Sequence, residues 1–127
     1  MNSDSFPFQL LDDPTAFHDP QAVVVRVPAG LRAKQKVLGV LADGLRFPRY
    51  FGYNWDALEE SLRDLAWLKP PRVVIVHADL PFGSGENRAI YLQVLANVIA
   101  HWQGSDKCQF AVIFPTEVWA EMEPLLA

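Results

Sequence analysis

Runs of β-branched and other apolar residues alternate with segments of helical periodicity along this 127-residue chain. Continuous apolar runs of this kind are typical of strands that are buried on both faces. They occupy residues 22–27, 72–77 and 108–114. Apolar positions spaced by three and four residues predict helices between and after these runs. The predicted helices cover residues 32–43, 55–65, 87–102 and 117–123.

Strands that alternate with helices predict an α/β fold with one small parallel sheet. We expect three strands, joined by right-handed crossovers and packed with about four helices. Thr116 is placed to cap the last helix, and Pro124 to break it. Residues 1–21 are interpreted as an N-terminal arm and residues 22–127 as the folded domain. One short ordered piece is expected around residues 8–11, and the arm either extends the sheet or covers the second helix.

Residues 46–54 have the composition of a loop that leads into a helix. Pro48 fixes its own φ and disfavours helical backbone at the residue before it. Gly52 permits backbone angles that other residues resist. Asn54 has the short polar side chain that accepts a hydrogen bond from a free N–H group at a helix start.

The same loop is rich in aromatic residues, with Tyr50, Phe51 and Tyr53 next to the glycine. We expect Phe51 to pack against the core. The two tyrosines are expected in half-exposed positions at an interface, because the ring is apolar and the hydroxyl is polar.

The helix that follows has an apolar side and an acidic side. The apolar positions are Trp55, Leu58, Leu62 and Leu65. The acidic positions, at steps of four, are Asp56, Glu60 and Asp64. Like charges at this spacing repel by about 0.2–0.5 kcal/mol per pair. Arg63 is placed to pair with Glu59 at i,i+4. An acidic stripe beside an aromatic loop indicates a surface for a cationic partner, with a merely solvated helix face as the alternative.

Composition narrows the classes of function. The formal net charge of −4 disfavours a direct nucleic-acid binder and is compatible with a basic protein partner. Cys108 is the only cysteine, which excludes an internal disulfide and suits a reducing compartment. The first residues lack the basic and apolar regions of a signal peptide, and no apolar run is long enough to span a membrane. We therefore expect a cytoplasmic protein.

Candidates for catalysis or cofactor binding are weak. His18, His77 and His101 share no metal-ligand spacing, although His77 ends a predicted strand, where α/β folds often place their sites. Residues 83–85 (Gly-Ser-Gly) precede a helix but lack the lysine of a phosphate-binding loop. Cys108 is interpreted as a small buried hydrophobic residue.

Asp56 and Glu60 are a candidate pair of catalytic carboxylates. They lie one turn apart on one helix face rather than across a cleft. We therefore expect no enzymatic activity, no cofactor and no metal site.

The run Y-F-G-x-N-W-D-A-L-x-x-x-L, which begins at Tyr50, resembles the barstar family. Members of this family are small intracellular inhibitors of secreted guanyl-preferring ribonucleases. The order of strands and helices extends the resemblance over about residues 22–114. It implies a three-stranded parallel sheet packed with helices, and an inhibitor that blocks the enzyme's active site without performing a reaction.

The resemblance also implies roles for individual residues. Glu60 corresponds to the central inhibitory carboxylate, which occupies the site of a substrate phosphate. Asp56, Tyr50, Gly52 and Asn54 would make the surrounding contacts. The complete set of expected partner-binding residues is Tyr50, Gly52, Tyr53, Asn54, Asp56, Glu59, Glu60 and Asp64.

Three positions depart from the family pattern. The central acid is usually Asp where this chain has Glu60, and the preceding position is often Trp where it has Glu59. Asn97 stands where a further acidic contact is expected. These changes leave the expected fold intact and keep two partners open, namely a basic extracellular ribonuclease or another protein bound by a barstar-like module. We expect a monomer that binds neither nucleic acid directly nor membranes.

Overall fold

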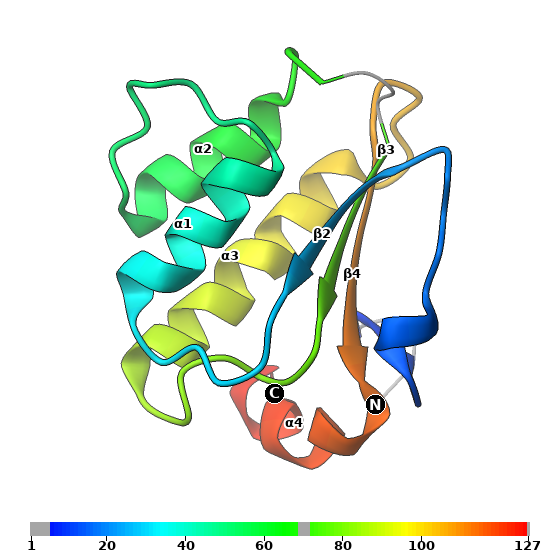
Figure 1. Ribbon diagram of the computed structural model, residues 1–127, viewed down its shortest axis with the longest axis vertical. Coiled ribbons are helices and arrows are strands. Elements are labelled where there is room, and N and C mark those ends of the chain that lie inside the picture. The colour runs from blue at the N-terminus through cyan, green and yellow to red at the C-terminus, as the bar shows by residue number, and fades with distance from the viewer. Residues whose placement is uncertain (1–5, 69–71, 127) are drawn as a thin grey trace.

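The computed structural model describes residues 6–68 and 72–126 and contains one parallel sheet with its long helices on one face (Figure 1). The elements follow the alternation of the sequence. In chain order they are β1 (Gln9–Leu11), the 3-10 helix η2 (Pro14–Ala16), β2 (Val23–Val27), α1 (Lys34–Gly44), α2 (Trp55–Asp64), β3 (Arg72–His77), α3 (Glu86–Trp102), β4 (Gln109–Pro115), the 3-10 helix η3 (Thr116–Val118) and α4 (Trp119–Leu126). None of the described helices combines the length and apolarity needed to cross a membrane.

The sheet has four strands in the order β1-β4-β3-β2, so the prediction of three strands is wrong. The α/β class, the parallel pairing and the four α-helices are as predicted. The additional strand, β1, comes from the ordered piece expected in the N-terminal arm. Gln9 pairs with Ile113 and Leu11 with Pro115, which extends the sheet beyond β4. A strand of three residues is too short to show a period of two, so the sequence does not reveal its pairing.

The face of the sheet that carries α1, α2 and α3 contains the main core (Figure 1). Alternate side chains of each strand point to this face. Val25 of β2 and Ile75 of β3 are buried here, under helix residues such as Leu41, Leu58 and Leu95. Because full burial of such a side chain stabilises the fold by about 1.5–3 kcal/mol, this face is the chief apolar contribution to the fold.

The opposite face of the sheet is also apolar, and the N-terminal arm covers it. Val74, Val76 and Ile113 are buried on this side, and Leu11 and Phe17 pack against them. The described part of the arm therefore both extends the sheet and covers its second face, rather than covering α2.

Polar contacts fix the arm to the sheet. Arg26 of β2 donates from Nη1 to the carbonyl oxygen of Pro14 (3.4 Å) and from Nη2 to that of Phe17. Asp19 forms an ion pair with Arg72 at 2.9 Å. These contacts hold the arm at two points across the strands.

Most element boundaries agree with the sequence, and the C-terminal segment does not. The chain runs through η3 into α4 and stays helical to Leu126, so the predicted break at Pro124 is wrong. Thr116 forms no cap hydrogen bond, because Pro115 holds the capping position of η3. Pro124 removes only the bond to the carbonyl of Ala120, and both residues are exposed, so water can hydrate that carbonyl.

Candidate functional site

The loop of residues 46–54 is tied to α1 at both of its ends. Near its start, the N–H of Phe47 donates to the carbonyl oxygen of Ala42 at 2.9 Å. Near its end, Nε2 of Gln35 donates to the carbonyl oxygen of Tyr53 at 3.2 Å. The loop therefore has a defined conformation before any partner binds.

Two non-glycine residues of this loop have left-handed backbone, Arg46 with φ of 56° and Tyr53 with φ of 51°. Such a conformation costs a residue with a side chain about 1–2 kcal/mol. Gly52 does not have a positive φ, so the predicted reason for a glycine there is wrong. A Cβ at position 52 would lie 3.2 Å from Nδ2 of Asn54, a tight contact that would require the capping side chain to shift.

Phe51 packs into the core and the two tyrosines do not, as predicted, but Tyr50 is more exposed than the half-exposed position expected for it. Phe51 is 7% exposed, and its ring centroid lies 4.8 Å from those of Phe47 and Tyr53. Tyr50 is 82% exposed and Tyr53 is 43% exposed. One ring thus anchors the loop to the core, while the two tyrosine side chains face the solvent.

Helix α2 begins with the predicted cap. Oδ1 of Asn54 accepts a hydrogen bond from the N–H of Ala57 at 2.8 Å, which satisfies one of the free donors of the first turn. Leu58 and Leu62 are fully buried beneath the helix. Leu65 ends it in left-handed backbone with φ of 51°. The helix is therefore fixed in rotation, and its acidic side is turned outward.

Trp55 connects the start of α2 to both neighbouring helices. Its Nε1 donates to Oδ1 of Asn87 at 3.3 Å, and its ring centroid lies 5.9 Å from that of Tyr91 on α3. Nζ of Lys34 on α1 lies 5.5 Å from the centre of the Trp55 ring. These contacts hold α2 in place against α1 and α3.

The three carboxylates of the acidic stripe are exposed. Oδ1 of Asp64 accepts a bond from the N–H of Ala66 at 3.3 Å, so it is partly used in ending the helix. Within residues 6–68 and 72–126, Asp56 and Glu60 take part in no ion pair and no side-chain hydrogen bond. These two carboxylates are free to meet a partner.

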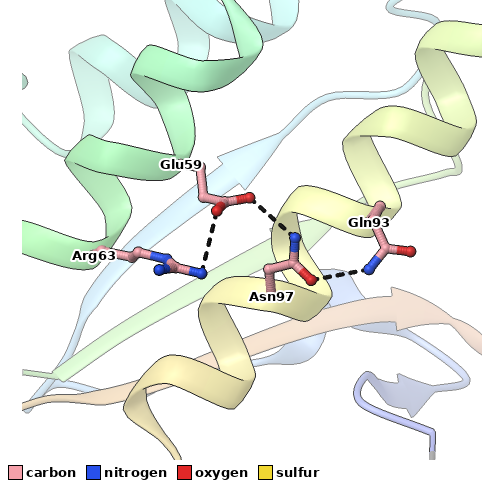
Figure 2. A network of polar contacts seen from close by, with 4 residues as sticks. All are labelled: Glu59, Arg63, Gln93 and Asn97. Carbon is pink, nitrogen blue, oxygen red and sulfur yellow. Dashed lines mark hydrogen bonds and ion pairs between the residues drawn. The ribbon is translucent and has the colours of Figure 1, made fainter.

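Glu59 differs from its neighbour Glu60, because both of its oxygens are engaged inside the molecule (Figure 2). Oε2 pairs with Nη2 of Arg63 at 3.2 Å, and Oε1 accepts a bond from Nδ2 of Asn97 at 3.1 Å. Oδ1 of Asn97 in turn accepts from Nε2 of Gln93 at 2.9 Å. The sequence predicts the pair with Arg63. It gives no sign of the link to α3, because the two residues are 38 positions apart.

His77, the candidate at the end of β3, is a structural residue. It is fully buried, and its ring is stacked on that of Phe114 at 4.0 Å. Burial lowers the pKa of His77 to about 3, so the ring is neutral. Nδ1 then donates to the carbonyl oxygen of Ile113 (3.1 Å), and Nε2 accepts from the hydroxyl of Tyr91 (2.7 Å). Both nitrogens are satisfied and neither reaches solvent.

Cys108 and the loop of residues 83–85 also have structural roles. Cys108 is 5% exposed, and burial raises the pKa of its thiol, as the interpretation of a small hydrophobic residue requires. In the loop that contains residues 83–85, Arg88 donates from Nε to the carbonyl oxygen of Pro81 (3.0 Å) and from Nη2 to that of Leu80 (3.2 Å). The buried guanidinium therefore supports this loop. Among the described residues, no three His, Cys, Asp or Glu side chains gather as a metal site would require.

Comparison with known proteins adds one positive finding. The family model described as Barstar (barnase inhibitor) matches residues 21–115, which include the loop, α2 and all strands except β1. No curated protein and no solved structure matches the chain. Because the match spans most of the 127 residues and includes the motif from Tyr50 to Leu62, the chain belongs to the barstar family of barnase inhibitors.

Proposed function

We propose that the protein inhibits a secreted guanyl-preferring ribonuclease by placing Glu60 of α2 in the enzyme's phosphate-binding site. The observation that carries this proposal is the free, exposed carboxylate of Glu60 on a helix whose other side is fully buried. A ribonuclease binds phosphate through clustered cationic groups, and a carboxylate can accept the same charge-assisted hydrogen bonds. The inhibitor acts inside the cell that makes the enzyme. This compartment is reducing, which suits the free thiol of Cys108.

The contacts around Glu60 follow from the same surface. Asp56 lies one turn before it and adds a second free carboxylate, which increases the attraction to a basic enzyme. Tyr50 and Tyr53 contribute apolar area with a polar tip, the kind of side chain that often dominates binding energy. Gly52 and Asn54 act mainly by shaping the loop and the helix start.

Glu59 is better described as a positioning residue than as a partner contact. Its carboxylate already has a cation and an amide as neighbours. A partner that drew Glu59 away would have to replace both interactions. Its proposed role is to hold α2 against α3, so that Glu60 and Asp56 stay correctly oriented.

Calorimetric titration against a panel of guanyl-preferring ribonucleases tests this function. We expect one-to-one binding with at least one enzyme, accompanied by loss of RNA cleavage. Glu60→Ala should reduce affinity by about 2–5 kcal/mol, the usual cost of truncating a buried charged contact. Glu123→Ala removes an exposed glutamate from α4, outside this surface, and should leave affinity unchanged.

A second candidate is a barstar-like module that binds a protein other than a ribonuclease. The engagement of Glu59 within the molecule favours it, because fewer carboxylates then remain for a strongly basic enzyme. Absence of binding across the ribonuclease panel, together with an intact fold, would favour this second candidate.

A further inference from the structure

The candidate surface carries unpaired positive charge beside its negative charge. Arg46 and Arg49 are exposed in the loop that also presents Tyr50. Among the described residues, neither arginine takes part in an ion pair or a side-chain hydrogen bond, whereas Arg63 and Arg72 do. The two guanidinium groups are therefore as free to meet a partner as the carboxylates of Asp56 and Glu60.

These arginines stand on a rigid support. Arg46 has left-handed backbone, and its neighbour Phe47 is held by a 2.9 Å hydrogen bond to Ala42 and by ring contacts to Phe51. A strained residue persists only where the surrounding structure imposes its conformation, and such residues concentrate at functional sites. Arginine and tyrosine on a rigid loop are also the residue types most enriched among dominant interface contacts.

The loop runs beside α2, so the arginines of the loop (the arginine row) and the carboxylates of the helix (the acidic row) belong to neighbouring segments. At the start of the loop, the carbonyl oxygen of Leu45 accepts a bond from Nε1 of Trp67, just beyond the C-terminal end of α2 (2.8 Å). At the end of the loop, Asn54 caps the first turn of the same helix. The loop thus returns along the helix from one end to the other, at the edge of the molecule (Figure 1).

We propose that the surface formed by residues 46–54 and α2 binds a protein whose interface places an acidic patch next to a cationic one. The cationic patch faces Asp56 and Glu60, and the acidic patch faces Arg46 and Arg49. This inference rests on the proposed function for the location of the surface, and it adds the charge pattern of the partner. A uniformly basic partner would be repelled by the arginine row, because like charges brought together at an interface weaken binding.

The sign of a charge-reversal effect distinguishes the two kinds of partner. For whichever panel ribonuclease binds, Arg46→Glu/Arg49→Glu should weaken affinity about tenfold or more, although it makes the surface more acidic. A uniformly basic partner would instead bind this variant more tightly, which would overturn the proposal. Arg32→Glu reverses one charge at an exposed arginine outside the surface, half of the change in the double variant, and should have little effect.

A second experiment tests the charge pattern without any ribonuclease. The charge-pattern proposal can therefore fail while the proposed inhibition stands, and the reverse. The ¹⁵N-labelled protein is titrated at low salt with two capped peptides, one of four glutamates and one of four lysines. We expect the glutamate peptide to shift the amide signals of the loop residues 46, 47, 49 and 50, since Pro48 has no N–H, and the lysine peptide those of residues 56–64. With Arg46→Gln/Arg49→Gln, the first set of shifts should disappear and the second should remain.

One outcome of that titration and one outcome of a sedimentation experiment would contradict the proposal. One is a glutamate peptide that leaves residues 46–50 unshifted or acts no more on them than on Arg32. The other concerns a second copy of the chain, which carries the same two rows and could occupy the surface itself. A salt-sensitive dimer in sedimentation experiments, abolished by Arg46→Glu/Arg49→Glu, would show that the surface binds itself rather than a different protein.

Discussion

The polar groups at the carboxyl end of β3 are buried and hydrogen-bonded, whereas those on the outer side of α2 are exposed. At the end of β3, His77 is fully buried, has a strongly lowered pKa, and uses both ring nitrogens within the fold. On α2, Asp56 and Glu60 are exposed and bonded to no described side chain. A shifted pKa at a strand end often marks an active site, but here it results from burial in a satisfied network. We propose that the exposed carboxylates of Asp56 and Glu60, rather than the buried histidine, are the functional groups of this protein.

From this comparison we expect substitutions at the end of β3 to lower stability, and substitutions on the outer side of α2 to lower affinity for the partner. His77→Ala removes a buried ring stacked on Phe114 and leaves the Tyr91 hydroxyl without its acceptor. We expect a loss of about 3–5 kcal/mol in the free energy of unfolding, measured by urea denaturation. The variant, tested at a temperature where it is folded, should bind a ribonuclease as the wild type does. A large loss of affinity in fully folded protein would show that the end of β3 takes part in recognition.

Acidification should lower the stability of the fold through His77 at the end of β3. The pKa of His77 is lowered to about 3, whereas the ordinary value of 6.5 applies in the unfolded chain. Between these values the unfolded chain binds a proton that the folded protein does not, so stability falls as the pH falls. From pH 7 to pH 5 this single group should lower the free energy of unfolding by about 2 kcal/mol.

Measuring the same interval with His77→Gln isolates this contribution, because the other titrating groups are common to both proteins. The difference between the two proteins should shrink as the pH is lowered. An equal loss of stability in both would mean that His77 is not responsible for the pH dependence.

Charge attraction on the α2 side should appear in the rate of association. Exposed charges are screened beyond about 8–10 Å at ordinary ionic strength. We expect the association rate with a ribonuclease to fall about tenfold from low to high salt, measured by stopped-flow fluorescence. The variant Asp56→Asn/Glu60→Gln should show a flatter dependence. An association rate of the wild type that does not change with salt would show that long-range charge attraction does not speed the encounter.

The smallest expected effect concerns the contact between α2 and α3. Asn97→Ala removes the amide that bonds to Glu59 and leaves Glu59 paired with Arg63 (Figure 2). We expect a loss of about 1 kcal/mol in the free energy of unfolding, the typical net value of one hydrogen bond. Affinity should fall less than in Glu60→Ala. An equal or larger loss of affinity would mean that Asn97 or Glu59 contacts the partner directly.

The sequence predicts those parts of this protein that depend on local pattern. The predicted strand of residues 72–77 matches β3 to the residue, because residues 73–76 are all β-branched. Asn54 caps α2 as expected, because capping needs only a short polar side chain at the helix start. Phe51 is buried and Tyr50 exposed, in line with the chemistry of the two rings.

The errors and omissions have tertiary causes. β1 depends on an edge of the sheet that forms only after folding. The left-handed residues are Arg46 and Tyr53 rather than the glycine between them, because the ties to α1 fix the path of the loop. The bond from Glu59 to Asn97 joins residues that only the packing of two helices brings together. The roles of the partner-binding residues remain predictions, supported by the family match and by the exposure of Glu60.

Competition with a nucleotide tests the central claim most directly. Binding of the wild-type protein to a panel ribonuclease is measured at increasing concentrations of guanosine 3′-monophosphate, which occupies the enzyme's active site. If Glu60 takes the place of the phosphate, the apparent Kd should rise in proportion to nucleotide concentration, and Glu60→Gln should bind more weakly while still competing. An apparent Kd that does not change with nucleotide would place the protein elsewhere on the enzyme and contradict the account.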